Sequence, residues 1–128
     1  MNNTPRVLCF NLSEGSEAAL NALCASMGIA LISISDAQCA QPLGTLAGLP
    51  GGTAPAHTGK LPFDEPMLVL CGMDEPTFDL FLRAFRFSGI PRIDLKAVLT
   101  PTNMAWNAVQ LRDELCRERD AIQRQRGN

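Results

Sequence analysis

The sequence predicts a single α+β domain built from two tandem βαβ units. Short apolar runs of strand length alternate with amphipathic stretches of helical period. The pattern of the first half returns in the second half at an offset of 61 residues, which carries Ser13 to Asp74 and Gly28 to Gly89. Two such units imply a four-stranded sheet with helices packed on one face, for which a ferredoxin-like arrangement is the simplest solution. A small doubly wound α/β sheet is the alternative.

The length and composition fit one globular domain. The chain has 128 residues, of which 46% are hydrophobic and 19% charged, and a chain of this size can bury a two-layer core. We expect one domain over residues 1–128. Residues 6–48 would form the first βαβ unit with a short helix, residues 49–66 a loop, and residues 67–128 the second unit with a C-terminal helix.

The first unit has the pattern of a strand, a capped helix and a second strand. The run Arg6 to Leu12 (RVLCFNL) is short and apolar, as in a buried strand. Ser13 is a preferred N-cap residue, and the apolar stripe of the following helix ends at Gly28. Ile29 to Ser35 (IALISIS) predicts the second strand, and residues 41–48 predict a short helix.

The second unit repeats these elements. Met67 to Gly72 (MLVLCG) predicts a strand, and Asp74 to Pro76 combines a capping carboxylate, a first-turn acid and a first-turn proline. An amphipathic helix follows, and Ile93 to Leu99 (IDLKAVL) predicts the fourth strand. We therefore expect residues 7–34 and 68–95 to superimpose.

A segment rich in proline and glycine separates the two units. Leu49 to Pro66 has proline or glycine at 7 of its 18 positions, which neither a strand nor a helix interior tolerates. We interpret it as an exposed loop, either a tolerated insertion or a lid. It contains His57, the only histidine. Because no second histidine or suitably spaced acid accompanies it, we expect a solvated side chain and no metal site.

A long polar helix is predicted from Asn103 to about Arg124. Its apolar positions are sparse, and at 1.5 Å per residue it would be roughly 30 Å long. A domain of this size has a radius of gyration of about 14 Å, so the last turns should project from the body. We expect this helix to meet a protein partner or a second copy of the chain.

Charge and cysteine content argue against several classes of protein. The chain has 11 basic and 13 acidic residues, which gives no broad positive field for nucleic acid. No stretch approaches the roughly 20 apolar residues of a membrane helix. Five cysteines lie in apolar runs without a C-x-x-C pair, which is typical of reduced thiols in the cytoplasm. We expect five unpaired thiols, with Cys9, Cys24 and Cys71 buried, in a cytoplasmic protein.

One turn has the composition of a small binding site. Thr100 to Asn103 (TPTN) follows a predicted strand and opens the last helix, where free amides and hydroxyls converge. With Trp106 one turn later, it could hold a carboxylate or a phosphate beside an aromatic wall. The alternative, which we favour, is structural. In that interpretation Thr102 or Asn103 caps the helix and Trp106 packs in the core.

Several of these segments resemble a known family. PMLVLCGM, the acidic pair that follows it, GIP, and above all LKAVLTPTNMAWN are similar to the bacterial family named domain of unknown function 3783, over roughly Pro66 to Leu115. The resemblance implies that Thr102 and Asn103 are recurring polar positions, with Thr100 as a nearby partner. The family has no established activity, so the resemblance supports the fold and the turn without supplying a mechanism.

The sequence contains no catalytic constellation. It has no G-x-S-x-G, P-loop or G-x-G-x-x-G motif, and no cysteine has a basic residue at a diagnostic spacing. We therefore expect a non-catalytic regulatory or protein-interaction module that uses no cofactor. The alternative is a sensor domain that binds a small anionic metabolite at the turn from Thr100 to Asn103.

Overall fold

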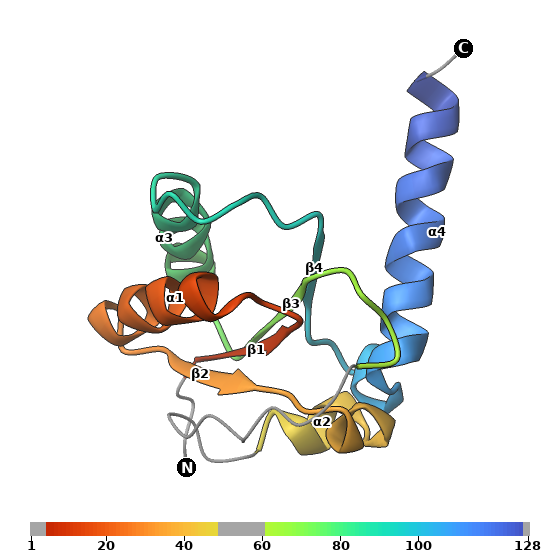
Figure 1. The fold of residues 1–128 in the computed structure, drawn as a ribbon, viewed down its shortest axis with the longest axis horizontal. Coiled ribbons are helices and arrows are strands. Elements are labelled where there is room, and N and C mark those ends of the chain that lie inside the picture. Colours follow the sequence, from red (N-terminus) through yellow and green to blue (C-terminus); the bar gives the residue numbers. More distant parts are fainter. Residues whose placement is uncertain (1–4, 49–60, 127–128) are drawn as a thin grey trace.

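The computed structural model describes residues 5–48 and 61–126 and has a four-stranded mixed sheet at its centre (Figure 1). Its elements, in chain order, are β1 (Arg6–Phe10), α1 (Glu14–Ser26), β2 (Ala30–Ser33), the 3-10 helix η1 (Ala37–Ala40), α2 (Leu43–Leu46), β3 (Met67–Cys71), α3 (Glu75–Arg86), β4 (Leu95–Val98), the 3-10 helix η2 (Asn103–Ala105) and α4 (Ala108–Arg126). The expected α+β fold, a four-stranded sheet from two tandem βαβ units with an added C-terminal helix, is confirmed.

The sheet has the strand order β2-β1-β3-β4, which the sequence had left open. Within each unit the two strands are parallel neighbours, and the units meet through the antiparallel pair β1–β3. The two units therefore lie side by side and are not interleaved as in a split βαβ motif. The antiparallel centre also excludes an all-parallel, doubly wound sheet. It leaves β2 and β4 as the edge strands.

The backbone follows the offset of 61 residues through the first strand and the helix of each unit. β1 and β3 correspond residue for residue. After each strand the chain takes a positive φ, 62° at Asn11 and 68° at Gly72, and after each helix it does so again, 71° at Gly28 and 85° at Gly89. Glycine adopts this conformation without steric cost, and asparagine tolerates it. The turns of the two units are therefore equivalent in conformation.

The second strands do not follow that offset. β2 begins at Ala30, whose counterpart is Pro91, but β4 begins only at Leu95. Proline has no amide to donate to the ladder, so pairing with β3 starts further along the chain. The predicted superposition of residues 7–34 on 68–95 is therefore correct for the strand and the helix and wrong for the second strand, which also starts later than the predicted Ile93.

The predicted caps of α1 and α3 are present. The Ser13 Oγ accepts a hydrogen bond from the Ser16 amide at 3.2 Å, and the Asp74 Oδ1 accepts one from the Thr77 amide at 2.9 Å. Hydrogen bonding to Thr77 lowers the pKa of the Asp74 carboxyl. These side chains satisfy amides that the first helical turn leaves unpaired.

Apolar side chains cover both faces of the sheet. On one face α1 and α3 pack over Val7, Cys9, Leu31, Leu68 and Leu70. On the other face, α2, η1 and the start of α4 pack over Leu8, Phe10, Ile32, Met67, Val69 and Leu95. The predicted layer of helices on one face is thus α1 and α3, and the added helices form a further layer opposite. Cys9, Cys24 and Cys71 are buried as predicted, and all five cysteines are unpaired.

The described end of the proline- and glycine-rich segment is anchored to β1. The Asn11 Nδ2 donates to the carbonyl oxygens of Phe63 at 2.6 Å and Glu65 at 3.3 Å, and the Phe63 side chain is buried. Residues 49–60 of the predicted loop, with His57, lie outside the described residues. Among the helices that the structure describes, none combines the length and the hydropathy needed to cross a bilayer.

Candidate functional site

The structure brings Thr100 and Asn103 together, but their polar groups bind each other. The Thr100 amide donates to the Asn103 Oδ1 at 2.8 Å, and the Asn103 amide donates to the Thr100 Oγ1 at 3.1 Å. The Asn103 Nδ2 donates to the Val98 carbonyl at 3.0 Å, and the residue is 8% exposed. The groups expected to meet an anion are therefore engaged within the turn.

The other two residues of the predicted site, Thr102 and Trp106, take no part in these side-chain hydrogen bonds. The exposed Thr102 precedes η2 and makes no side-chain capping bond. Trp106 is half-buried and packs against the core cluster beneath α2 and α4, and its carbonyl accepts a hydrogen bond from the Leu43 amide at 2.8 Å. The backbone of Trp106 therefore joins the segment before α4 to the start of α2.

The long helix begins later than predicted. α4 starts at Ala108, so Thr102 and Asn103 do not cap it. The Asn107 Oδ1 accepts from the Gln110 amide at 2.9 Å, and the Gln110 Oε1 accepts from the Asn107 amide at 2.9 Å. This is the reciprocal geometry of a capping box. The signal in the sequence, an asparagine three residues before a glutamine, was missed.

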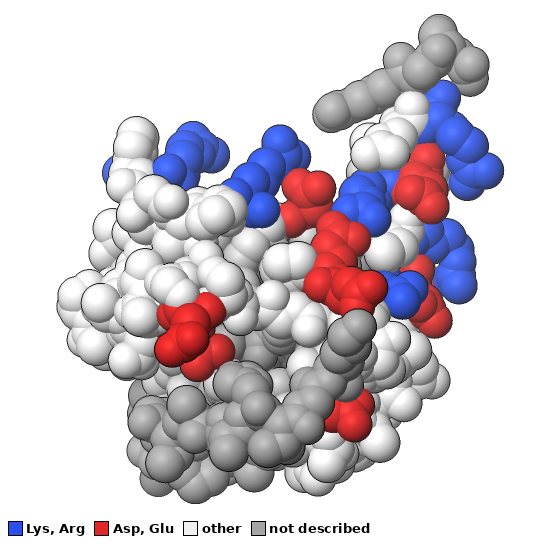
Figure 2. Space-filling view, in the orientation of Figure 1, with Lys and Arg blue, Asp and Glu red and all other residues white. Residues whose placement is uncertain are grey.

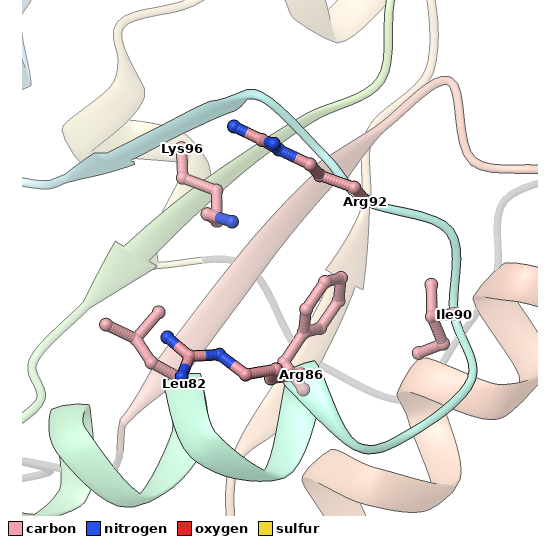
Figure 3. Close-up of a pocket in the computed structure, with 6 residues that line it drawn as sticks. Leu82, Arg86, Ile90, Arg92 and Lys96 are labelled. Atoms are coloured by element: carbon pink, nitrogen blue, oxygen red, sulfur yellow. The ribbon is translucent and has the colours of Figure 1, made fainter.

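A cavity that sequence reasoning did not find lies between α3 and β4 (Figure 3). This α3–β4 pocket has a volume of about 490 Å³. Three basic residues, here called the basic rim, line it: Arg86, Arg92 and Lys96. Three apolar residues, here called the apolar floor, lie among them: Leu82, Phe85 and Ile90. None of the described lining residues is acidic.

The basic rim is assembled from two elements. Figure 3 shows Arg86 along α3, across the cavity from Arg92 and Lys96, which come from the chain that leads into β4 and from β4 itself. The Lys96 Nζ lies 5.5 Å from the centroid of the Phe85 ring. Burial lowers the pKa of Lys96, and the positive charges of Arg92 and Arg86 lower it further against the opposing effect of Asp94.

A local cluster of basic residues in the sequence could have indicated this pocket. Between Arg83 and Lys96 there are four basic residues and one acid, Asp94, although the whole chain has a net charge of −2. The net charge of the chain concealed this cluster. Basic side chains gather along the edge of the molecule above α3 and the connection to β4 (Figure 2).

A second hollow separates β4 from the projecting half of α4. This β4–α4 groove has a volume of about 360 Å³ and is lined on the strand side by Arg92, Asp94 and Lys96, and on the helix side by Leu115, Glu118, Arg119, Ile122 and Gln123. Ile122 is 51% exposed. In Figure 1 the last turns of α4 extend beyond the sheet, as the length of the predicted helix implied.

Ion pairs join Arg119, on the helix side of this groove, to Glu65 and Asp94. The Arg119 guanidinium donates to both carboxylate oxygens of Glu65, at 3.2 Å to Oε1, and lies 3.7 Å from the Asp94 Oδ2. The Asp94 Oδ1 lies 2.9 Å from the Arg92 Nε. Bonding to Glu65 raises the pKa of Arg119. The network links α4, the entry to β4 and the segment before β3.

The outer edge of β4 faces this groove. β4 pairs with β3, and no described strand lies on its other side. The Leu99 amide donates to the Leu70 carbonyl at 2.9 Å. In a parallel ladder the amide and carbonyl groups of one residue point to the same neighbouring strand, and those of the next residue point to the opposite side. Since Leu99 bonds to β3, the amide and carbonyl groups of Lys96 and Val98 point away from β3. The Val98 carbonyl oxygen already accepts the hydrogen bond from the Asn103 side chain. The side chain of Lys96 forms no salt bridge with any described residue.

The described residues offer little for covalent or metal chemistry. Burial raises the pKa of the Cys9, Cys24 and Cys71 thiols to about 12, and that of Cys39 to about 11. At neutral pH these four groups are protonated and therefore weak nucleophiles. No group of three or more metal-ligating side chains is found within residues 5–48 and 61–126.

The fold and these surfaces define a small α+β module of two βαβ units with a projecting C-terminal helix. Residues 66–122 match the family described as Domain of unknown function (DUF3783). The matched span runs from the start of β3 through most of α4 and includes every residue that lines the α3–β4 pocket. No curated protein and no solved structure matches the chain.

Proposed function

We propose that this chain is a non-catalytic protein-interaction module that binds an extended, acidic segment of a partner protein in the β4–α4 groove. The observation that carries the proposal is an open strand edge beside a projecting helix. An extended peptide can add to such an edge through its backbone, while the helix wall receives its side chains.

Apolar contacts on the helix side support this function. Leu115 packs against the core at the base of α4, and Ile122 continues the same stripe one heptad later with half of its surface exposed. Residues seven apart lie on one helix face. The apolar stripe therefore extends beyond the part of α4 that the sheet covers, and alternate apolar side chains of a bound strand would pack on it.

The charges on the strand side of the groove favour acidic side chains in the partner, while Glu118 lies on the helix side. Arg92 and Arg119 share Asp94, whereas Lys96 on the open edge has no carboxylate partner among the described residues. An acidic residue opposite Lys96 would form a favourable cross-strand pair. A lysine on an exposed edge also discourages pairing with strands that offer it no negative charge. Lys96 would therefore make the edge selective for acidic segments.

A second copy of the chain is the other occupant to be tested, because a symmetric antiparallel pairing of α4 about the Leu115–Ile122 stripe would set Glu118 opposite Arg119 of the partner helix. Sensing of a small anion at Thr100 is less well supported, since the polar groups of that turn bind each other.

The proposal is tested by binding of a short, terminally blocked peptide of alternating valine and glutamate. A peptide of the same length in which lysine replaces each glutamate serves as the charge control. NMR titration of the full chain should give saturable shifts at Lys96 and Ile122 with the glutamate peptide only. Ile122→Asp should abolish binding, whereas Ala121→Asp, an exposed neighbour outside the groove lining, should preserve it. Equal loss in both variants, or a dimer of the free chain that Ile122→Asp dissociates, would overturn the proposal.

A further inference from the structure

We infer that the α3–β4 pocket is a binding site for a small organic phosphate, with the phosphate held by the basic rim and the organic group lying on the apolar floor. The α3 side of this site is distinct from the proposed partner groove, because Arg86 and Leu82 line the pocket and do not line the groove. The two share Arg92 and Lys96, so variants of Arg86 test the pocket alone.

Helix stability explains only part of the basic rim. Arg83 and Arg86 lie in the last turn of α3, where positive charge stabilises the helix dipole. That effect does not account for Arg92 and Lys96, which lie outside the helix and line the same cavity as Arg86. Three basic side chains from separate elements thus line one cavity, with Arg86 and Arg92 exposed and Lys96 half-buried.

The convergence leaves the rim with uncompensated positive charge. Lys96 is half-buried, and its partial burial together with the positive charges of Arg92 and Arg86 lowers its pKa. Asp94 offsets part of this, but its carboxylate is bound to Arg92 and close to Arg119. A bound anion would offset the repulsion among the positive charges of the basic rim, which contributes favourably to its binding free energy. A neutral ligand would not receive this contribution.

Size and charge define the class of ligand. A volume of about 490 Å³ lies within the range of small-molecule sites, roughly 300–1,000 Å³. A phosphate monoester carries about −1.5 to −2 charges at neutral pH and presents several acceptor oxygens to the two guanidinium forks. A carboxylate carries one charge and two oxygens. The apolar floor of Leu82, Phe85 and Ile90 suits an apolar or aromatic group attached to the phosphate.

NMR titrations with phenyl phosphate, inorganic phosphate, benzoate and phenol test the site in the full chain. We expect phenyl phosphate to bind with saturable shifts at Ile90 and Lys96, inorganic phosphate to bind at the same amides more weakly, and phenol to leave them unchanged. Benzoate should bind at least about tenfold more weakly than phenyl phosphate. Equal affinity for phenol or benzoate would overturn the assignment.

A matched pair of variants separates the site from general electrostatic attraction. Arg86→Gln removes a member of the rim and should weaken phenyl phosphate binding at least about tenfold. Arg83→Gln removes the same charge from the same helix turn but not from the pocket lining, and should change binding by less than about twofold. Both side chains are exposed, so both variants should fold. Equal effects of the two substitutions would contradict a built site.

Discussion

Thr100 and Asn103 cap each other: each side-chain oxygen accepts a hydrogen bond from the other residue's backbone amide, at 2.8 and 3.1 Å. A third bond from the Asn103 Nδ2 closes the turn onto the end of β4 at Val98. The two residues therefore fix the direction in which the chain leaves the sheet, and with it the position of η2 and α4 beside the β4 edge.

Replacement of Asn103 by alanine should be the most destabilising change in this turn. It leaves the Thr100 amide and the Val98 carbonyl without their partner, which costs about 1–3 kcal/mol of unfolding free energy. Thr102→Ala is the matched control, because Thr102 is exposed and makes no capping bond; its effect should stay within about 0.5 kcal/mol. Urea unfolding measures both. A larger loss for Thr102 than for Asn103 would contradict the observed hydrogen bonds.

Asn107→Ala should destabilise the protein by about 0.5–2 kcal/mol, the usual cost of removing an N-cap side chain. Asn107 and Gln110 satisfy each other's amides at the start of α4, and the substitution removes one of these bonds. Gln125→Ala near the end of α4, where the side chain is exposed, provides the control. Chemical denaturation of the two variants decides the question, and an equal midpoint for Asn107→Ala and wild type would count against the capping box.

The sequence predicted those parts of the fold that local patterns control. The caps Ser13 and Asp74 and the left-handed turns at Gly28 and Gly89 depend on a few neighbouring residues, and their residue types determine them. Strand order could not be derived in this way. It depends on the antiparallel contact of β1 with β3, which joins residues about sixty positions apart and has no local signature.

The candidate sites were harder to predict for the same reason. Arg86 and Lys96 are ten positions apart on different elements, and only the return of the chain across the sheet brings them to one cavity. Thr100 and Asn103 were predicted as ligand-binding positions, and their distance along the chain could not show that they would use their hydrogen-bonding groups on each other. Trp106 was assigned to the core or to a ligand wall, and the structure has it packed against the core.

A thiol-reactive dye should distinguish Cys116 from the other cysteines. Cys9, Cys24, Cys39 and Cys71 are buried, whereas Cys116 is half-buried, and burial keeps the first four protonated. We expect at most one fast-reacting thiol in the native protein and five after denaturation without reductant. Three or fewer thiols in freshly prepared, denatured protein would contradict the unpaired state.

Alkaline pH should destabilise the fold through the same thiols. Folding raises the pKa of Cys9, Cys24 and Cys71 from 9.0 to about 12, so between these values the folded state holds more protons than the unfolded state. Their contribution is fully present below pH 9 and is lost as the pH rises towards 12. The urea midpoint should fall between pH 9 and 11. Cys24→Ala should show a shallower fall, and an unchanged slope in that variant would contradict this cause.

Amide hydrogen exchange can show whether the β4 edge accepts a partner strand. With the valine–glutamate peptide bound, exchange of the Lys96 amide should slow by at least about tenfold, since its N–H would enter a new ladder. Exchange along β2, the other edge strand, should not change. Protection along β2, or peptide binding that leaves Lys96 unprotected, would contradict the account.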